Sequence, residues 1–403
     1  MVLRRNLIIL LAVACGVSVA NLYYNQPLLV DMGKSFGVTA RQAGLIATLS
    51  QAGYAVGMLA FVPLADLLER RRLIVLLQLA VAVALAGVAL APPYAVLVAA
   101  SFAGGLTTVV PQIIIPTGGA LAEPQERGRV IGSLYTGLLL GILLARTVSG
   151  FVGHEWGWRA MFGLAAAAAV LLAAVLRAGL PHSRPPATHS YPELMRSMWR
   201  MVRTYPELRD ASVVGGALFG TFSAFWTTLA FHLAAAPFSY GPRVAQVAGL
   251  FGIVGCAGAV ASPLAGRLAD RRGPKFVISI GVAIVLVSWL VFLAAGNTLA
   301  GLVVGVILLD AGLQAAHICN QMRIFALAEG AQGRANAVYM ISYFTGGSVA
   351  SYLAAVAWDR YGWPGVCAVG TGLTLIAAVT HVRSLVNVRA AAASAEVAEP
   401  AGA

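Results

Sequence analysis

Three ionisable side chains embedded in long apolar runs are the residues of this chain most suited to chemistry. Asp310 and His317 lie in the stretch LLDAGLQAAHICNQMRI, and Arg146 lies in TGLLLGILLARTVSG. Ionisable groups at membrane depth cost about 2.5–3.5 kcal/mol each on insertion scales, so they mark substrate or proton paths. Histidine titrates near neutral pH, and arginine stays charged and clamps anions. We expect Asp310 and His317 to couple proton movement, and Arg146 to bind substrate or to pair with Asp310. The alternative for Arg146 is that its side chain snorkels outwards to the membrane surface.

Helical geometry aligns Asp310 and His317 with two glutamines. At about 100° per residue, Gln314, His317 and Gln321 lie within about 40° of Asp310 around the helix axis. A lipid-facing helix could not hold such a polar stripe, so the stripe must face protein or water. It indicates a proton and substrate path, and the alternative is a polar network that joins this helix to a neighbour.

The segment NLYYNQPLL, near the end of the first apolar run, also offers polar side chains. Asn21 and Asn25 are four residues apart with Tyr24 beside them, which predicts a cavity-lining face in the outer half of a helix. A signal-peptide cleavage after Ala20 is the least favoured interpretation. The residues expected at the interfacial rim are Tyr23, Gln26 and Pro27. Further candidates for substrate contact are Gln51, Gln112, Phe222, Trp226 and Tyr343, and for the three aromatic residues among them helix packing is the alternative.

Composition places these residues in a membrane. Hydrophobic residues make up 59% of the 403, charged residues only 10%, and the mean hydropathy is +0.83. A soluble domain carries about 25% charged residues, whereas apolar runs of about 20 residues mark membrane-spanning helices. An all-α integral membrane protein with twelve spans is therefore expected, at residues 7–29, 42–67, 73–91, 94–120, 129–152, 159–180, 211–235, 245–268, 276–295, 298–322, 335–357 and 363–385.

The net charge of +12 has a topological cause. Most of the 27 Lys and Arg residues fall on alternate connections, as the positive-inside rule demands when both termini are cytoplasmic. This pattern explains the basic composition without nucleic-acid binding, which is not expected. The four cysteines (Cys15, Cys256, Cys319 and Cys367) lie inside apolar segments without metal-ligand spacing, so no metal site is expected.

The two halves of the chain repeat one another. The stretch PLADLLERRRLI is similar to the later stretch PLAGRLADRRGPKFVI, and this alignment matches Asp66 with Asp270. Gly141 matches Gly346 at nearly the same separation along the sequence. Such a parallel repeat predicts two six-helix bundles related by a pseudo-two-fold axis along the membrane normal. The expected division is a bundle at 1–180, a cytoplasmic linker with a short amphipathic helix at 181–210, a bundle at 211–387 and a disordered tail at 388–403.

Twelve spans, a long central loop and these paired loops resemble the major facilitator superfamily. Its loop motif G-x-L-A-D-R-x-G-R-[RK] is matched well by residues 266–275, whereas the first copy departs from it at Val62, Leu67 and Glu69. The carboxylate of such a motif can meet a helix N-terminus and nearby arginines, which would lock the inner side shut until it opens. The gate residues expected from the motif are Asp66, Arg70, Arg71, Gly266, Asp270, Arg271, Gly273 and Lys275.

Within the superfamily the chain resembles the bacterial drug and metabolite exporters, through NLYYNQPLL and the Gly137 and Gly141 pair. The resemblance implies export of small organic compounds across the inner membrane by proton antiport with alternating access. An uncoupled facilitator, a proton symporter of a nutrient and a non-transporting receptor are the alternatives. No GxSxG, HExxH or Walker A pattern supports an enzyme. The expected partners are a small molecule, lipid and protons around a monomer, with the proton gradient as energy source and no cofactor.

Overall fold

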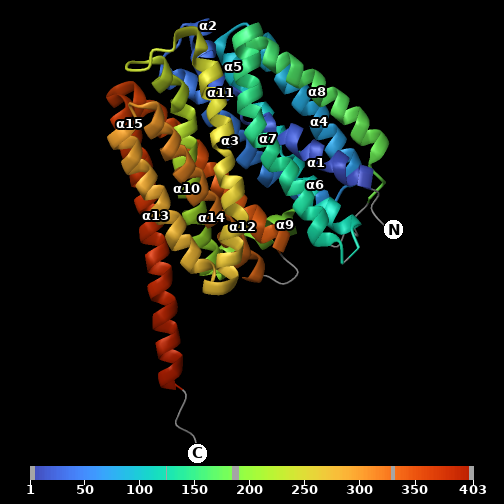
Figure 1. The fold of residues 1–403 in the computed structure, drawn as a ribbon. Helices are drawn as coiled ribbons and strands as arrows, with labels where there is room; N and C mark the ends of the chain where they lie inside the picture. Colours follow the sequence, from blue (N-terminus) through green and yellow to red (C-terminus); the bar gives the residue numbers. More distant parts are fainter. Residues whose placement is uncertain (1–4, 124, 184–189, 328–331, 399–403) are drawn as a thin grey trace, which may run out of the picture.

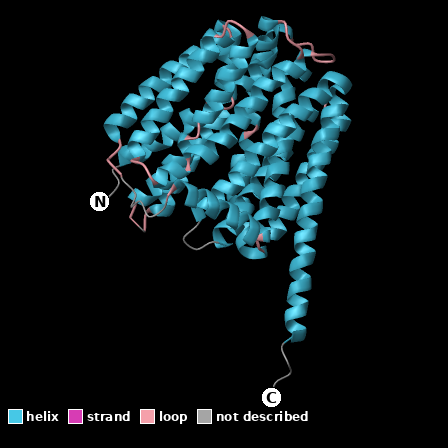
Figure 2. Cartoon of the chain, turned by 180° about the vertical axis from the view of Figure 1, so that it is seen from behind, coloured by secondary structure: helices cyan, strands magenta, loops and turns pink. Residues whose placement is uncertain are grey.

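The computed structural model describes residues 5–123, 125–183, 190–327 and 332–398, and over these ranges the chain is helical without strands (Figure 2). Part of the expected linker, 184–189, and the last residues of the expected tail, 399–403, lie outside them. Long apolar helices dominate because a backbone in lipid must satisfy its own hydrogen bonds.

The described residues of the first half form eight α-helices and a short 3₁₀ turn. Thr39 and Gln42 form a capping box at the start of α3, and Gly157, with φ of +83°, allows α8 to follow α7 directly. The bounds are α1 Arg5–Ala20, α2 Asn25–Phe36, α3 Ala40–Phe61, η1 Pro63–Asp66, α4 Arg70–Leu90, α5 Tyr94–Thr107, α6 Val110–Leu121, α7 Arg127–Trp156 and α8 Trp158–Gly179.

The second half follows α9, a helix that buries Leu194, Met198 and Met201 and lies in the range 181–210, where the sequence predicts a short amphipathic helix. The bounds are α9 Tyr191–Thr204, α10 Pro206–Ala234, η2 Gly241–Arg243, α11 Val244–Val254, α12 Cys256–Arg272, α13 Pro274–Ala295, α14 Leu299–Leu327 and α15 Gln332–Ala398. The last helix is kinked at Gly362 and continues through Ala398, across most of the expected disordered tail. The alanine-rich sequence there has a high helix propensity.

Nine helical stretches of the described ranges are long and apolar enough to span a membrane. The count of twelve remains a prediction, because three expected spans are each divided and two others are merged. The first expected span is divided into α1 and α2, and the eighth into α11 and α12. The fourth is divided into α5 and α6, which together still form one stretch of membrane length, and α15 contains both of the last two spans.

The helices of the two halves lie on opposite sides of the molecule. Figure 1 shows α4, α6 and α8 on one side and α13, α14 and α15 on the other. Within each half, matched glycines pack on the first helix. A Cβ on Gly141 would lie 2.2 Å from the carbonyl oxygen of Gly16, and one on Gly346 would lie 2.1 Å from that of Gly216. Small residues thus let the helix backbones approach closely.

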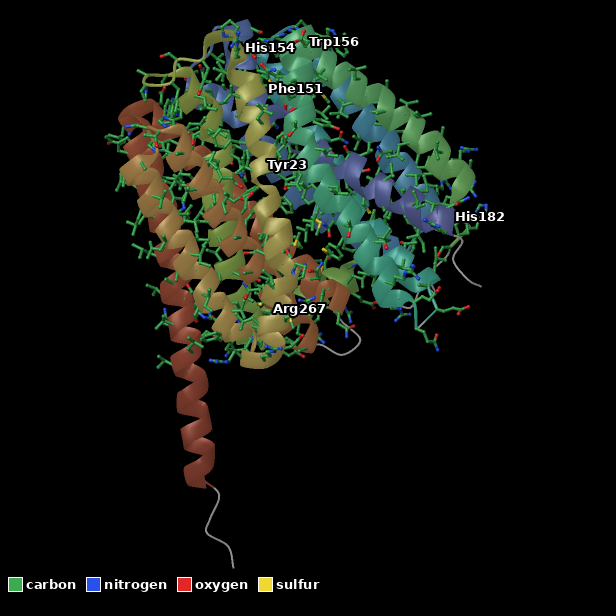
Figure 3. All side chains as sticks on the ribbon, viewed as in Figure 1. Tyr23, Phe151, His154, Trp156, His182 and Arg267 are labelled. Atoms are coloured by element: carbon green, nitrogen blue, oxygen red, sulfur yellow. The ribbon has the colours of Figure 1, made fainter. Side chains whose placement is uncertain are left out.

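The two ends of the bundle differ. We call the end that carries the α2–α3 and α7–α8 connections the α2 end, and the opposite end the α9 end. Figure 3 places His154 and Trp156 at the α2 end, Arg267 near the other end and Tyr23 between them.

Backbone contact and hydrogen bonds join the halves toward the α2 end. A Cβ on Gly150 of α7 would lie 2.4 Å from the carbonyl oxygen of Ala245 of α11, and Thr147 Oγ1 donates to the carbonyl of Gly249 at 2.9 Å. Arg41 donates to the Tyr352 hydroxyl at 2.9 Å. This end of the molecule is therefore closed.

Candidate functional site

A cavity of about 380 Å³ lies at the centre of the molecule, with walls from both halves. Most of its lining is apolar or aromatic, with a few polar and charged groups, as is usual for small-molecule sites. The lining residues are Val19, Tyr23, Tyr54, Gln112, Tyr135, Leu138, Leu139, Ile142, Leu143, Arg146, Phe219, Phe222, Gly255, Ser262, Asp310, Leu313, Gln314, His317, Ile318, Gln321, Met340, Tyr343 and Phe344.

Arg146 is the cation of this cavity and is only 1% exposed. Its Nε donates to Gln26 Oε1 at 2.7 Å, and its guanidinium carbon lies 3.9 Å from the ring centroid of Trp226 and 4.8 Å from that of Tyr23. Aromatic faces stabilise a desolvated guanidinium electrostatically. Arg146 Nη2, however, is buried without a hydrogen-bond partner, so the arginine keeps one donor free.

Asp310 is the acid of the cavity and is 5% exposed. Its Oδ1 is buried without a hydrogen-bond partner. Its Oδ2 lies against the break between α11 and α12, where a Cβ on Gly255 would come within 2.6 Å of it. Asp310 and Arg146 come from opposite halves and are close enough to attract each other electrostatically. A buried acid and a buried cation from opposite halves thus line one cavity.

The polar stripe predicted on α14 faces this cavity. Asp310, Gln314, His317 and Gln321 all line it. His317 Nδ1 lies 2.9 Å from the Tyr339 hydroxyl, which fixes the orientation of the imidazole ring. The predicted position of the stripe is correct, because α14 is an unbroken helix over these residues.

Of the other predicted contact residues, Gln112, Arg146, Phe222 and Tyr343 line the cavity. Trp226 does not, but its ring lies against the guanidinium of Arg146 and its indole N–H lies beside the carboxylate of Asp310.

Gln51 joins the two halves instead of lining the cavity. Ser223 Oγ donates to Gln51 Oε1 at 3.1 Å, and Gln51 Nε2 donates to Ser351 Oγ at 3.3 Å. Gln51 thus links α3 of the first half to α10 and α15 of the second half.

The structure corrects the sequence interpretation of residues 21–27. Asn21, Tyr24 and Asn25 do not line the cavity, and Asn25 Nδ2 instead donates to Ser50 Oγ at 3.2 Å. Tyr23 and Gln26, expected at the interfacial rim, are buried beside Arg146.

The physical reason is a helix break. α1 ends at Ala20 and α2 begins at Asn25, so the rotation expected for a continuous helix does not apply. The signal in the sequence is Pro27, which lacks an N–H and clashes with the carbonyl of the residue four positions earlier, Tyr23.

The expected gate residues lie toward the α9 end. Arg70 Nη2 lies 3.9 Å from Asp66 Oδ1, and Arg71 Nη1 donates to the Leu180 carbonyl at 3.2 Å. In the second copy, Asp270 and Arg271 are exposed, Gly266 and Lys275 are half-buried, and Gly273 makes the turn into α13 with φ of +85°.

A second cavity of about 130 Å³ adjoins the first, sharing Gln112 and Tyr135 with it. It is lined by Asp66 and Arg70 of the first half and by Arg334 of the second. The central cavity therefore continues toward the α9 end, whereas hydrogen bonds between the halves close the α2 end.

Two helical halves around a central cavity, closed toward one end, define a multi-pass membrane transporter. The family model of the Major Facilitator Superfamily matches residues 11–261 and 213–401, and the chain belongs to this family. The family predicted from the sequence is confirmed.

The chain is similar to curated transporters along most of its length. It is 39% identical to the uncharacterized transporter YgaY of Escherichia coli O157:H7, over 92% of this chain and 93% of that one. It is 26% identical to a probable sugar efflux transporter of Helicobacter pylori, over 87% and 88%. The crystal structure of the nucleoside transporter NupG has the same fold, with a TM-score of 0.74 at 14% identity, over 94% and 98% of the two chains.

Proposed function

We propose that this transporter exports small organic compounds across the bacterial inner membrane in exchange for protons. The observation that carries the proposal is the buried, unpartnered Oδ1 of Asp310 in a cavity between the two halves. A hydrogen-bond donor of the substrate and a proton would compete for this oxygen. Binding of one then releases the other, which is the requirement for exchange.

Alternating access would expose this cavity to the two sides in turn, by rocking of one half against the other. The arginine-rich α9 end is assigned to the cytoplasm, with both termini, because of the positive-inside rule. Asp66, Arg70 and the matching second-half loop would close that side when the α2 end opens.

His317 would pass the proton between Asp310 and the second cavity. It lies two helical turns from Asp310 on the same face of α14, or about 10 Å along the axis. Its ring is held by Tyr339, and the next turn carries Gln321, which donates to Asn336 at 3.2 Å. The transporter would act as a monomer, with the proton gradient as its energy source and no cofactor.

Export is the proposed direction because the similar Helicobacter pylori protein carries a name that describes efflux. Proton symport is the second candidate, and the free Nη2 of Arg146 favours it. An anion bound to Arg146 would deprive Asp310 of its counter-charge, so that an anion and a proton would bind together.

The sign of the proton exchange separates the two candidates. The purified chain is placed in weakly buffered detergent solution with a pH indicator, and small organic compounds are added in turn. Proton release on binding supports exchange, whereas proton uptake supports symport and contradicts the proposal.

Vesicles with an internal pH dye then test flux under an imposed gradient. Asp310→Asn should abolish compound-driven proton movement, and the exposed Asp359→Asn should leave it unchanged. Compound-driven proton movement that survives in Asp310→Asn would remove Asp310 from the coupling role.

A further inference from the structure

We infer that the central cavity selects zwitterionic aromatic compounds, with a carboxylate bound by Arg146, an ammonium bound by Asp310 and a ring seated on the aromatic wall. The inference rests on the proposed transport function and adds the chemical class of the substrate.

The first argument is that Arg146 and Asp310 lie against two glycines only three residues apart, one in the last turn of α11 and one at the break that follows it. A Cβ on Gly252 of α11 would lie 3.1 Å from Arg146 Cβ, and a Cβ on Gly255 would lie 2.6 Å from Asp310 Oδ2. Three residues rise about 4.5 Å along a helix. The absence of side chains at both glycines lets Arg146 and Asp310 approach the same short stretch of chain, and both residues line the central cavity, within reach of one small molecule.

The second argument is the complementary set of free atoms. Arg146 has one unpartnered donor, Nη2, and Asp310 has one unpartnered acceptor, Oδ1, both buried, and the indole N–H of Trp226 beside Asp310 is neutral and supplies no counter-charge. A buried polar atom without a partner is costly, and a charged one more so. A singly charged ligand would satisfy one of these atoms and leave the other unmatched. A molecule with both an anionic and a cationic group satisfies both atoms. The site therefore selects against compounds that carry only the anionic group or only the cationic group.

The third argument comes from the internal repeat. Counted from the matched pair Gly141 and Gly346, Arg146 corresponds to Ser351 of the second half. Counted from Gly128 and Gly333 in the same way, Asp310 corresponds to Gly105. Each half therefore supplies one charged residue, and the corresponding residue of the other half is uncharged. Because the repeat does without a charge at each position, the duplicated fold itself does not require the charged pair.

The fourth argument is the aromatic wall beside the charged groups. The rings of Phe219 and Tyr343 are stacked with centroids 4.0 Å apart, and those of Phe219 and Phe222 are stacked at 5.5 Å. Flat rings of this kind form a surface for a planar apolar group. The volume of about 380 Å³ suits a compound of one or two rings, near the lower end of the usual range for ligand sites.

The test compares three zwitterions (phenylalanine, tryptophan and glycyl-phenylalanine) with their singly charged derivatives. The C-terminal amide of each keeps only the ammonium, and the des-amino acid of each keeps only the carboxylate. Binding to the purified chain is measured by calorimetric titration at neutral pH. Each zwitterion that binds should do so about ten to a hundred times more tightly than both derivatives, because each derivative leaves one buried charge unmatched. Absence of this preference in all three series, including absence of any binding, would overturn the inference.

Variants assign each preference to one residue. Asp310→Asn should abolish the preference over the des-amino acid and keep the preference over the amide. Arg146→Gln should do the opposite, and Arg146→Lys, which keeps the charge if the Gln variant does not fold, should retain both. The matched controls outside the cavity, Asp359→Asn and Arg243→Gln, are exposed and should change neither preference. Loss of both preferences in either control would contradict the assignment.

Failure of this inference can be told apart from failure of the transport proposal. Proton exchange driven in vesicles by neutral or singly charged compounds, without zwitterion preference, would refute the substrate class and leave exchange in place. Preferential zwitterion binding without proton exchange would support the substrate class and refute the coupled export.

Discussion

Replacing Gln51 by leucine should favour opening of the α2 end. The side chain makes two buried hydrogen bonds between the halves, with Ser223 at 3.1 Å and with Ser351 at 3.3 Å. Hydrogen bonds between membrane helices contribute about 0.6 kcal/mol each on average. Loss of both should cost the closed arrangement about 1.2 kcal/mol, which raises the ratio of open to closed molecules about eightfold. Leucine fills similar space, so the bundle interiors are preserved.

Spin labels on the two halves at the α2 end measure this ratio. Cysteines introduced at Glu155 and Asn297, both exposed, are labelled in a background without native cysteines, and the distance distribution is recorded by pulsed electron resonance. The population at long distance should increase in Gln51→Leu.

The matched control is Ser18→Ala. It removes one buried side-chain hydrogen bond, from Ser18 Oγ to Gln78 Oε1 at 3.0 Å, which lies within the first half. This variant should leave the distance distribution unchanged. A Gln51→Leu distribution identical to that of the control would refute the conclusion that Gln51 holds the halves together.

Three further substitutions test the packing around the cavity. Gly141→Ala should destabilise the protein by about 1–3 kcal/mol in thermal denaturation, because the added methyl group meets the α1 backbone, whereas Gly163→Ala, which meets no atom within 4 Å, should not. Gln26→Leu should cost about 1–3 kcal/mol in the same assay, since it leaves Arg146 Nε unpaired. Gly255→Val should reduce compound-driven proton movement severalfold in vesicles, because its side chain would occupy the space beside the acid of α14; unchanged flux would contradict this.

The sequence predicts regular helices well and helix breaks poorly. A rotation of about 100° per residue predicts the cavity-facing stripe from Asp310 to Gln321, because it holds along an unbroken helix. The same rule does not apply from Asn21 to Gln26, where the chain turns between α1 and α2. For this reason the sequence wrongly predicts an interfacial position for Tyr23 and Gln26, which contact Arg146.

Contacts between the halves could not be derived from the sequence either. Gln51 and Gln112 are both polar residues in apolar spans, and nothing in their local pattern distinguishes them. Gln112 lines the cavity and donates to the Tyr54 hydroxyl at 3.1 Å, whereas Gln51 joins the two halves. The difference depends on which helices of the other half lie opposite, and this follows from the assembled fold.

The close contact between α7 and α11 has a mechanical consequence. Gly150 meets the backbone of Ala245, and Gly249 meets that of Arg146, so no flexible side chains separate the two halves at this point. Two rigid bodies that touch backbone to backbone can pivot about the contact more readily than they can slide past it. We expect the two halves to rotate about this contact, so that they move far apart at the distant α9 end and only slightly beside Arg146. The distance between Arg146 and Asp310 would then stay nearly constant while access to the cavity changes.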